Sequence, residues 1–185
     1  MVVTAPPRPL AIVFKQMLDG DVRKLAAESN DSPTGGGARD LRFPDAPFRA
    51  VLDRFFPKVT SVSHNGGEVR SGRLVWHHDN KTDVYDVECW PPTDARPTEC
   101  RIARIHGLPP LLQCPEPQFG DPVFIILTLD STGDFRADYA RESELASRWR
   151  TEIASPIRRS LDSARTGRAA CGWYLIPENL EYLHE

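Results

Sequence analysis

The sequence predicts a mainly β domain with two or three helices at its periphery. Its 17 prolines among 185 residues favour loops, edges and turns over long helices. Short runs of β-branched and aromatic residues recur between residues 73 and 176 and are typical of strands. The length predicts a single domain, residues 1–185, and the 40% hydrophobic content is enough for a sizeable core.

The expected elements before Pro57 are a helical segment, a short strand, a second strand and an amphipathic helix, at residues 11–18, 22–27, 41–44 and 46–56. The last helix has the clearest pattern. Phe48, Val51, Leu52 and Phe55 recur at helical spacing, and Pro57 ends the run. We expect these side chains to belong to the core.

Strands are predicted for the middle of the chain at residues 73–77, 84–90, 101–105 and 123–130. The last of these is the most apolar and is expected to be central and buried. A turn at 131–134 should lead into a hairpin partner at 135–139. A helical stretch at 142–161, interrupted near Ser155 and Pro156, and a final strand at 172–176 complete the expected fold.

Composition limits the class of protein. The formal net charge of −3 is mildly unfavourable for a nucleic-acid binder, although binding depends on local patches. There is neither an apolar run of membrane-spanning length nor a signal-peptide pattern. The four cysteines have wide spacings that match neither a zinc knuckle nor a redox pair, so we expect free thiols in a cytoplasmic protein.

A polar segment ahead of residue 43 stands out. Three glycines, 35–37, follow a polar turn and precede Arg39 and Arg42. Exposed backbone N–H groups and two guanidinium forks on one loop suit a polyanion that approaches closely. A solvated loop with arginines on its rim explains the same pattern, and no Gly-Lys-Ser/Thr phosphate loop is present.

The sequence gives less support to a catalytic function. Asp83, Asp86 and Glu88 share one predicted strand, but the lysine that usually accompanies a Mg²⁺-dependent nuclease site is missing. His77 and His78 are adjacent, and adjacent strand residues point to opposite faces, so they chelate a metal poorly. A Cys–His nucleophile pair has no local motif in its favour.

Basic residues gather in three groups that have the donors needed to contact DNA. The groups are Arg23, Lys24, Arg39 and Arg42; His77, His78, Asn80 and Lys81; and Arg96, Arg101, Arg104 and His106. A fourth, looser set lies on and after the predicted helical stretch 142–161 and, on a helix, is more typical of a solvated face: Arg148, Arg150, Arg158, Arg159, Arg165 and Arg168.

Several segments, in order along the chain, resemble the N-terminal effector-binding domain of EcoRII-type restriction endonucleases. They are Val-Arg-Lys-Leu at 22–25, Ser-Asn-Asp at 29–31, Thr-Gly-Gly at 34–36, Phe-Phe-Pro at 55–57, Arg-Ile-Ala-Arg-Ile-His-Gly at 101–107, the apolar strand 125–130 and Trp-Tyr-Leu-Ile-Pro-Glu at 173–178. The shared order covers nearly the whole chain, although each motif alone is weak. The family continues Thr-Gly-Gly with His-Gln, where this chain has Gly37, Ala38 and Arg39, so a different recognised sequence is expected.

The resemblance implies a B3-like DNA-binding pseudobarrel that grips the major groove with two arms, one at residues 23–42 and one at about 77–106. The resemblance also implies further DNA-contacting positions beside the basic residues given above. These are Ser29, Asn30, Asp31, Thr34, Gly35 and Gly36. The family's nuclease half does not follow, so the chain is expected to be either a domain of a longer enzyme or a stand-alone reader.

The leading hypothesis is therefore a sequence-specific double-stranded DNA-binding domain of a restriction-modification type system. It would need no cofactor, would not itself be an enzyme, and would act with a nuclease domain or subunit, away from membranes. Two alternatives stay open: a small Mg²⁺-dependent nuclease using Asp83, Asp86 or Glu88, and a protein-interaction module of a phage-defence system.

Overall fold

One curled sheet contains every strand that the structure describes, from near the start of the chain to near its end. The computed structural model describes residues 8–26, 40–163 and 169–184. The strands are β1 (Pro9–Met17), β2 (Leu41–Pro44), β3 (Lys58–Val62), β4 (Glu68–His78), β5 (Lys81–Trp90), β6 (Glu99–Ala103), β7 (Val123–Asp130), β8 (Phe135–Arg141), β9 (Cys171–Leu175) and β10 (Leu180–Leu183). Their order in the sheet is β10-β9-β1-β7-β8-β4-β5-β6-β2, and β3 pairs with β4 beside this path.

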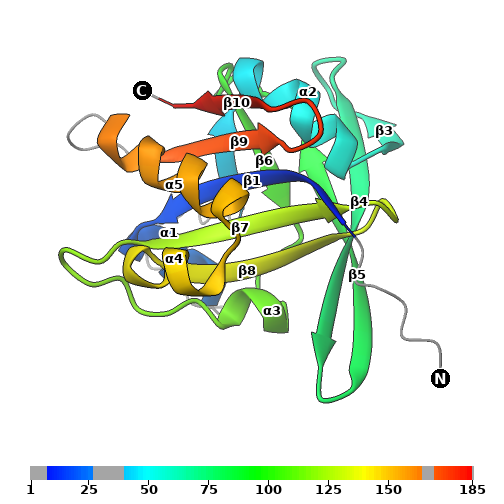
Figure 1. The fold of residues 1–185 in the computed structure, drawn as a ribbon. Coiled ribbons are helices and arrows are strands. Elements are labelled where there is room, and N and C mark those ends of the chain that lie inside the picture. The colour runs from blue at the N-terminus through cyan, green and yellow to red at the C-terminus, as the bar shows by residue number, and fades with distance from the viewer. Residues whose placement is uncertain (1–7, 27–39, 164–168, 185) are drawn as a thin grey trace.

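The sheet bends into a half-barrel with short helices around it (Figure 1). These helices are α1 (Asp19–Ala26), α2 (Asp45–Phe55), α3 (Pro109–Leu112), α4 (Leu145–Arg148) and α5 (Thr151–Ser163), with a 3-10 turn at Glu142–Glu144. The predicted fold class, mainly β with peripheral helices, is confirmed. In the described parts of the chain, no helix is both long enough and apolar enough to span a membrane.

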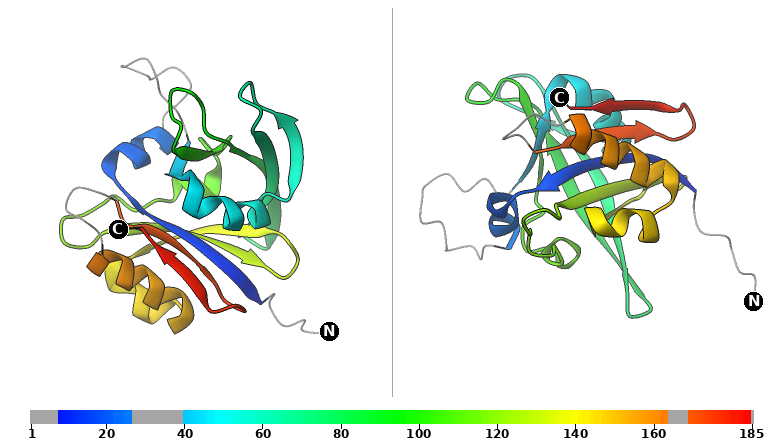
Figure 2. Two further views of the ribbon diagram at one scale, coloured as in Figure 1. Left: turned by 90° about the horizontal axis from the view of Figure 1, so that it is seen from above. Right: turned by 60° about the vertical axis from the view of Figure 1, so that its left-hand side comes forward.

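Helix α2 bridges the open side of the half-barrel. It follows β2 directly at one sheet edge and packs against β9 near the other edge. The indole Nε1 of Trp173 donates a hydrogen bond of 2.7 Å to the carbonyl of Pro47, and the rings of Phe48 and Tyr182 meet edge to face. Two sheet edges that do not pair are thus joined through a helix, as the view from above shows (Figure 2).

The core has two parts, one inside the half-barrel and one between the sheet and α5. Strand β7 contributes to both, because its alternate residues face the two clusters and all eight are buried. This explains why six of its eight residues are apolar, and the predicted central strand at 123–130 is confirmed. The predicted turn and hairpin that follow are also confirmed: Asp130 and Asp134 close the turn, and β8 pairs antiparallel with β7.

The first two expected elements are wrong. Residues 11–18 were expected to be helical, but β1 is a strand between β7 and β9. Residues 11–14 are buried on both faces, and an apolar run of that kind lacks the alternation that identifies a strand. Residues 22–27 were expected to form a strand, but they belong largely to helix α1, which begins with Asp19 and Asp21 in its first turn and buries Leu25.

The C-terminal helical region is interrupted at a different point from the one predicted. The break falls at Trp149 and Arg150, between α4 and α5, whereas Pro156 lies inside α5. Proline in the second turn removes one backbone hydrogen bond, and burial of Pro156 offsets that loss. Strands β3 and β10 and helix α3 were not predicted, since each has only four or five residues.

Candidate nucleic-acid interface

Part of the predicted first arm lies outside the described residues, namely Ser29, Asn30, Asp31, Thr34, Gly35, Gly36 and Arg39. The structure does show where that segment leaves and rejoins the fold. The N–H of Gly107 donates to the carbonyl of Leu25 near the end of α1, and Leu41 at the start of β2 pairs with Ile102 of β6. Both ends of the segment therefore lie beside β6, which belongs to the predicted second arm.

The outward face of the β5–β6–β2 sheet carries a row of two arginines and a tryptophan. Trp90, Arg101 and Arg42 are directly paired across the three strands. Their neighbours along the strands, such as Ile102 and Phe43, are buried in the core, so alternation turns the row outward. The structure thus brings together one residue from each predicted arm.

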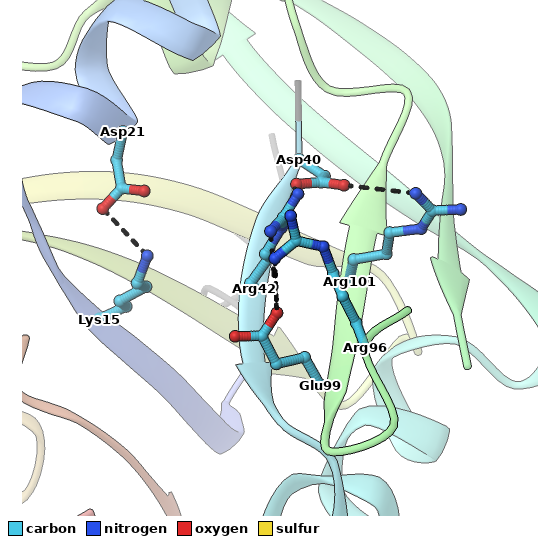
Figure 3. Close-up of polar contacts among 7 residues, drawn as sticks. All are labelled: Lys15, Asp21, Asp40, Arg42, Arg96, Glu99 and Arg101. Atoms are coloured by element: carbon cyan, nitrogen blue, oxygen red, sulfur yellow. Dashed lines mark hydrogen bonds and ion pairs between the residues drawn. The ribbon is translucent and has the colours of Figure 1, made fainter. Parts of the chain in front are cut away.

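A buried carboxylate holds the two arginines (Figure 3). Arg42 Nε lies 2.9 Å from one oxygen of Asp40, and Arg101 Nη1 lies 3.6 Å from the other. The Asp40 side chain is only 4% exposed, whereas Arg42 and Arg101 are 19% and 36% exposed. A carboxylate shared in this way restrains both guanidinium groups before any ligand arrives.

Arg96 joins the row through Glu99. The carboxylate of Glu99 lies 3.4 Å from Arg96 Nη1 and 3.7 Å from Arg42 Nη1 (Figure 3). Both partners of the Arg96 pair are about half exposed, so this contact is weaker than the one at Asp40.

Trp90 and Glu88 continue the network on the other side. The Arg101 guanidinium lies over the Trp90 ring, 5.1 Å from its centroid, and the Trp90 indole donates to Glu88 at 2.9 Å. Glu88 also pairs with Arg104 Nε at 3.1 Å. We name these seven residues the arginine cluster: Asp40, Arg42, Glu88, Arg96, Glu99, Arg101 and Arg104, with Trp90 supporting it. Four arginines against three carboxylates leave it one positive charge.

Arg104 does not continue the alternation of β6. In a regular strand over the predicted residues 101–105, Arg104 would share a side with Ile102, and Ile105 would share a side with Arg101. The backbone of Arg104 is left-handed, with φ of 60°, so the strand ends at Ala103 and alternation restarts. Arg104 therefore reaches Glu88 and is exposed, whereas Ile105 is buried.

The second basic group lies on a hairpin arm, which we define as residues 75–84 of β4 and β5. Asp79 and Asn80 form its two-residue turn and both have positive φ, at 44° and 60°, as such turns require. His77 Nδ1 lies 2.9 Å from Thr82 Oγ1 on one face. On the other face His78 stacks on Trp76 with ring centroids 3.8 Å apart and bonds Asp83 at 2.6 Å.

The residues predicted to form the second arm therefore lie in two separate regions, the hairpin arm and the arginine cluster. Strand β5 begins at Lys81 in the hairpin arm and ends at Trp90 in the arginine cluster, a span of roughly 30 Å for an extended strand of this length. The two basic groups thus lie near opposite ends of one strand, as Figure 1 shows for β5.

The other predicted residues take peripheral positions. Arg23 and Lys24 lie on α1, where Arg23 is exposed, and His106 is exposed just beyond β6. Lys15 of β1 anchors α1 through a 3.0 Å ion pair with Asp21, both side chains being almost buried (Figure 3). In the looser fourth set, Arg148 and Arg159 are ion-paired with Glu144 and Glu181.

Two of the three strand carboxylates considered for a nuclease, Asp83 and Glu88, have other partners. Asp83 bonds His78, and Glu88 bonds Trp90 and Arg104. Among the described residues no group of three or more His, Cys, Asp or Glu side chains could hold a metal ion.

All four cysteines are free thiols. Cys89 and Cys100 are buried on neighbouring strands, and the Cys89 thiol, together with burial, raises the pKa of Cys100 well above its usual range. Burial raises the pKa of Cys114 to about 11. Thiols in this state are poor nucleophiles at neutral pH.

Sequence reasoning missed three residues that organise the interface: Asp40, Trp90 and Glu99. The available signal was a pair of opposite charges two residues apart, with Asp40 just before the predicted strand 41–44 and Arg42 within it. The pairing of β2 with β6, which places Arg101 next to them, is a long-range contact that no local pattern reveals. Comparisons of the chain with models of protein families, with curated proteins and with solved structures find no match.

Proposed function

We propose that this chain is a sequence-specific double-stranded DNA-binding domain, acting as the target-recognition part of a restriction-type system and related to the B3-like pseudobarrels that its sequence resembles. The observation that carries the proposal is the restrained row of Arg42 and Arg101. Arginine forks bound to guanine edges are the commonest specific contact in the major groove. An arginine side chain that Asp40 already restrains loses less conformational entropy on binding DNA than an unrestrained arginine side chain does.

Arg101 can still offer part of its guanidinium to a ligand, because the side chain is 36% exposed. Its Nη1 faces Asp40 and its guanidinium carbon lies over the Trp90 ring, while its buried Nε atom has no hydrogen-bond partner among the described residues. An arginine kept for structure alone is normally satisfied when buried.

The hairpin arm supplies the second element of the proposal. A two-stranded ribbon fits the width of the major groove, and the tip presents His77, Asn80 and Lys81 to solvent. Contacts from such residues to phosphates would set the register of the protein on the duplex.

The proposal is tested by selection from a random duplex pool at low salt, followed by titration of the selected site at rising salt. We expect recovery of a defined site and an affinity that falls steeply with salt, because contacted phosphates release counterions. Failure to bind any duplex at low salt would reject the proposal and favour a protein-interaction module. Discrete fragments formed with Mg²⁺, and abolished by Glu88→Ala, would favour a nuclease.

A further inference from the structure

Strands β4 and β8 separate after a single point of contact. They pair in parallel only at Leu74 and Phe135. Beyond it β4 continues into the hairpin arm, while β8 runs along β7 to Arg141. The β4-facing edge of β8 therefore has no strand partner after Phe135 among the residues described. Figure 1 shows the arm passing below β8, with α3 beside it.

The separated strands enclose a cleft of about 400 Å³, within the usual range for small-ligand sites. Trp76 and His77 of the arm line one side, and α3 with the segment after it, β8 and α4 line the rest. The lining residues outside the arm that have charged or amide side chains are Gln113, Arg136, Asp138 and Arg148.

The cations in the cleft are only partly used by the protein. Arg148 Nη1 pairs with Glu144 at 2.8 Å, and Arg136 Nη2 lies 4.0 Å from Asp130. Both side chains are partly exposed and keep further donors. Desolvation by the surrounding protein raises the pKa of Asp138, which lies two residues from Arg136 on β8, although both arginines act in the opposite direction.

These groups match the parts of one nucleotide. Trp76 lines the cleft and has one ring face stacked on His78, so its other face is the aromatic surface that a base would use. Gln113 and Asp138 offer the donor and acceptor atoms that a base edge requires. Arg136 and Arg148 suit the phosphate. The charged and amide groups in the lining favour a polar, anionic ligand over an apolar one.

We propose that the cleft between β4 and β8 binds a single nucleotide drawn out of the DNA duplex. The inference rests on the proposed function, because the cleft lies at the base of the arm that would contact the DNA. An unpaired nucleotide next to the arm reaches the cleft without crossing the molecule.

The test measures affinity for duplexes that carry one mismatch, moved in turn along the selected site. A mismatched base is easier to extrude, so at one position the mismatch should bind the wild-type chain roughly tenfold more tightly than the matched duplex. Trp76→Ala and Asp138→Asn should lose that preference, and Trp76→Phe should keep most of it. Arg158→Ala, on the exposed face of α5, is the matched control and should behave as wild type.

The outcomes separate the two proposals. Duplex binding with no position of mismatch preference, or a preference that persists in both Trp76→Ala and Asp138→Asn, would overturn the nucleotide cleft and leave DNA binding intact. Absence of binding to any duplex by the wild-type chain would reject the proposed function itself. Circular dichroism of each variant establishes that a loss is not caused by unfolding.

Discussion

The arginine cluster and the hairpin arm share strand β5 but differ in how their charged residues are held. In the cluster, Arg42 and Arg101 come from adjacent strands and meet on a carboxylate that is 4% exposed. In the arm, His78 and Asp83 come from two strands of one hairpin, and Asp83 is 48% exposed. The cluster is thus organised by the whole fold, and the arm by local pairing alone.

This difference separates two roles in binding. Side chains restrained before binding favour discrimination between ligands, because misplaced partners leave buried groups unpaired. Side chains on an exposed ribbon adapt to many surfaces and supply charge. We therefore expect sequence discrimination from the cluster and general affinity from the arm.

The sharpest test of this comparison replaces one basic residue from each region. Arg101→Ala should weaken binding to the selected site by about 1–3 kcal/mol, and binding to unrelated DNA by less, since a base contact is lost. Arg104→Ala, and Arg39→Ala outside the described residues, are expected to act in the same direction. Lys81→Ala should weaken all duplexes nearly equally and reduce the salt slope by about one.

Competition titrations at several salt concentrations measure both the ratio of specific to random affinity and the salt slope. Arg158→Ala is the control for a basic residue on a helix surface. The comparison fails if Arg101→Ala leaves the ratio of specific to random affinity unchanged while Lys81→Ala or Arg158→Ala collapses it.

A second test, made without DNA, compares how much the carboxylates of Asp40 and Asp83 contribute to the free energy of unfolding. Asp40→Asn should lower the free energy of unfolding by about 2 kcal/mol, because it leaves Arg101 beside a buried neutral group. Asp83→Asn, the matched change in the arm, should cost about 0.5 kcal/mol or less, since its pair is solvated. Urea denaturation measures both, and equal losses would contradict the distinction.

The turn of the arm gives a smaller, local effect. Asn80→Ala should cost about 1 kcal/mol, because alanine tolerates the left-handed backbone less well, whereas Asn80→Gly should be neutral or stabilising. The cost should appear as faster hydrogen exchange at amides of residues 75–84, with little change in global unfolding. A drop in global stability as large as the local one would show that the arm does not open independently.

The smallest predicted effect concerns the support under Arg101. Trp90→Leu should weaken binding to the selected site by about 0.5–1 kcal/mol, because the guanidinium loses its aromatic surface. Trp90→Phe keeps a ring and should lose less. Isothermal titration calorimetry resolves a change of this size, and identical values for both variants would argue against the ring contact.

Local sequence patterns predicted the elements whose environment is simple. Helix α2 has one apolar stripe, and β7 has five consecutive apolar residues, 123–127, ahead of a clear turn. Local patterns failed at β1, whose buried apolar run of residues 11–14 is too short to distinguish a strand from a helix, and at α1, which is too short to show clear helical spacing. Arg42, Arg101 and the hairpin residues were chosen from residue type and resemblance, but the carboxylate that organises two of them depends on strand pairing about 60 residues apart in the chain.

The half-barrel leaves two strands at the ends of its sheet order, β2 and β10, and each has only four residues. A short edge offers few backbone groups to another chain, and β2 also ends in Pro44, which has no N–H to donate. Edge-to-edge association through these strands is therefore disfavoured. At these two ends, the incompletely closed sheet avoids long unpaired edges without full closure of the barrel.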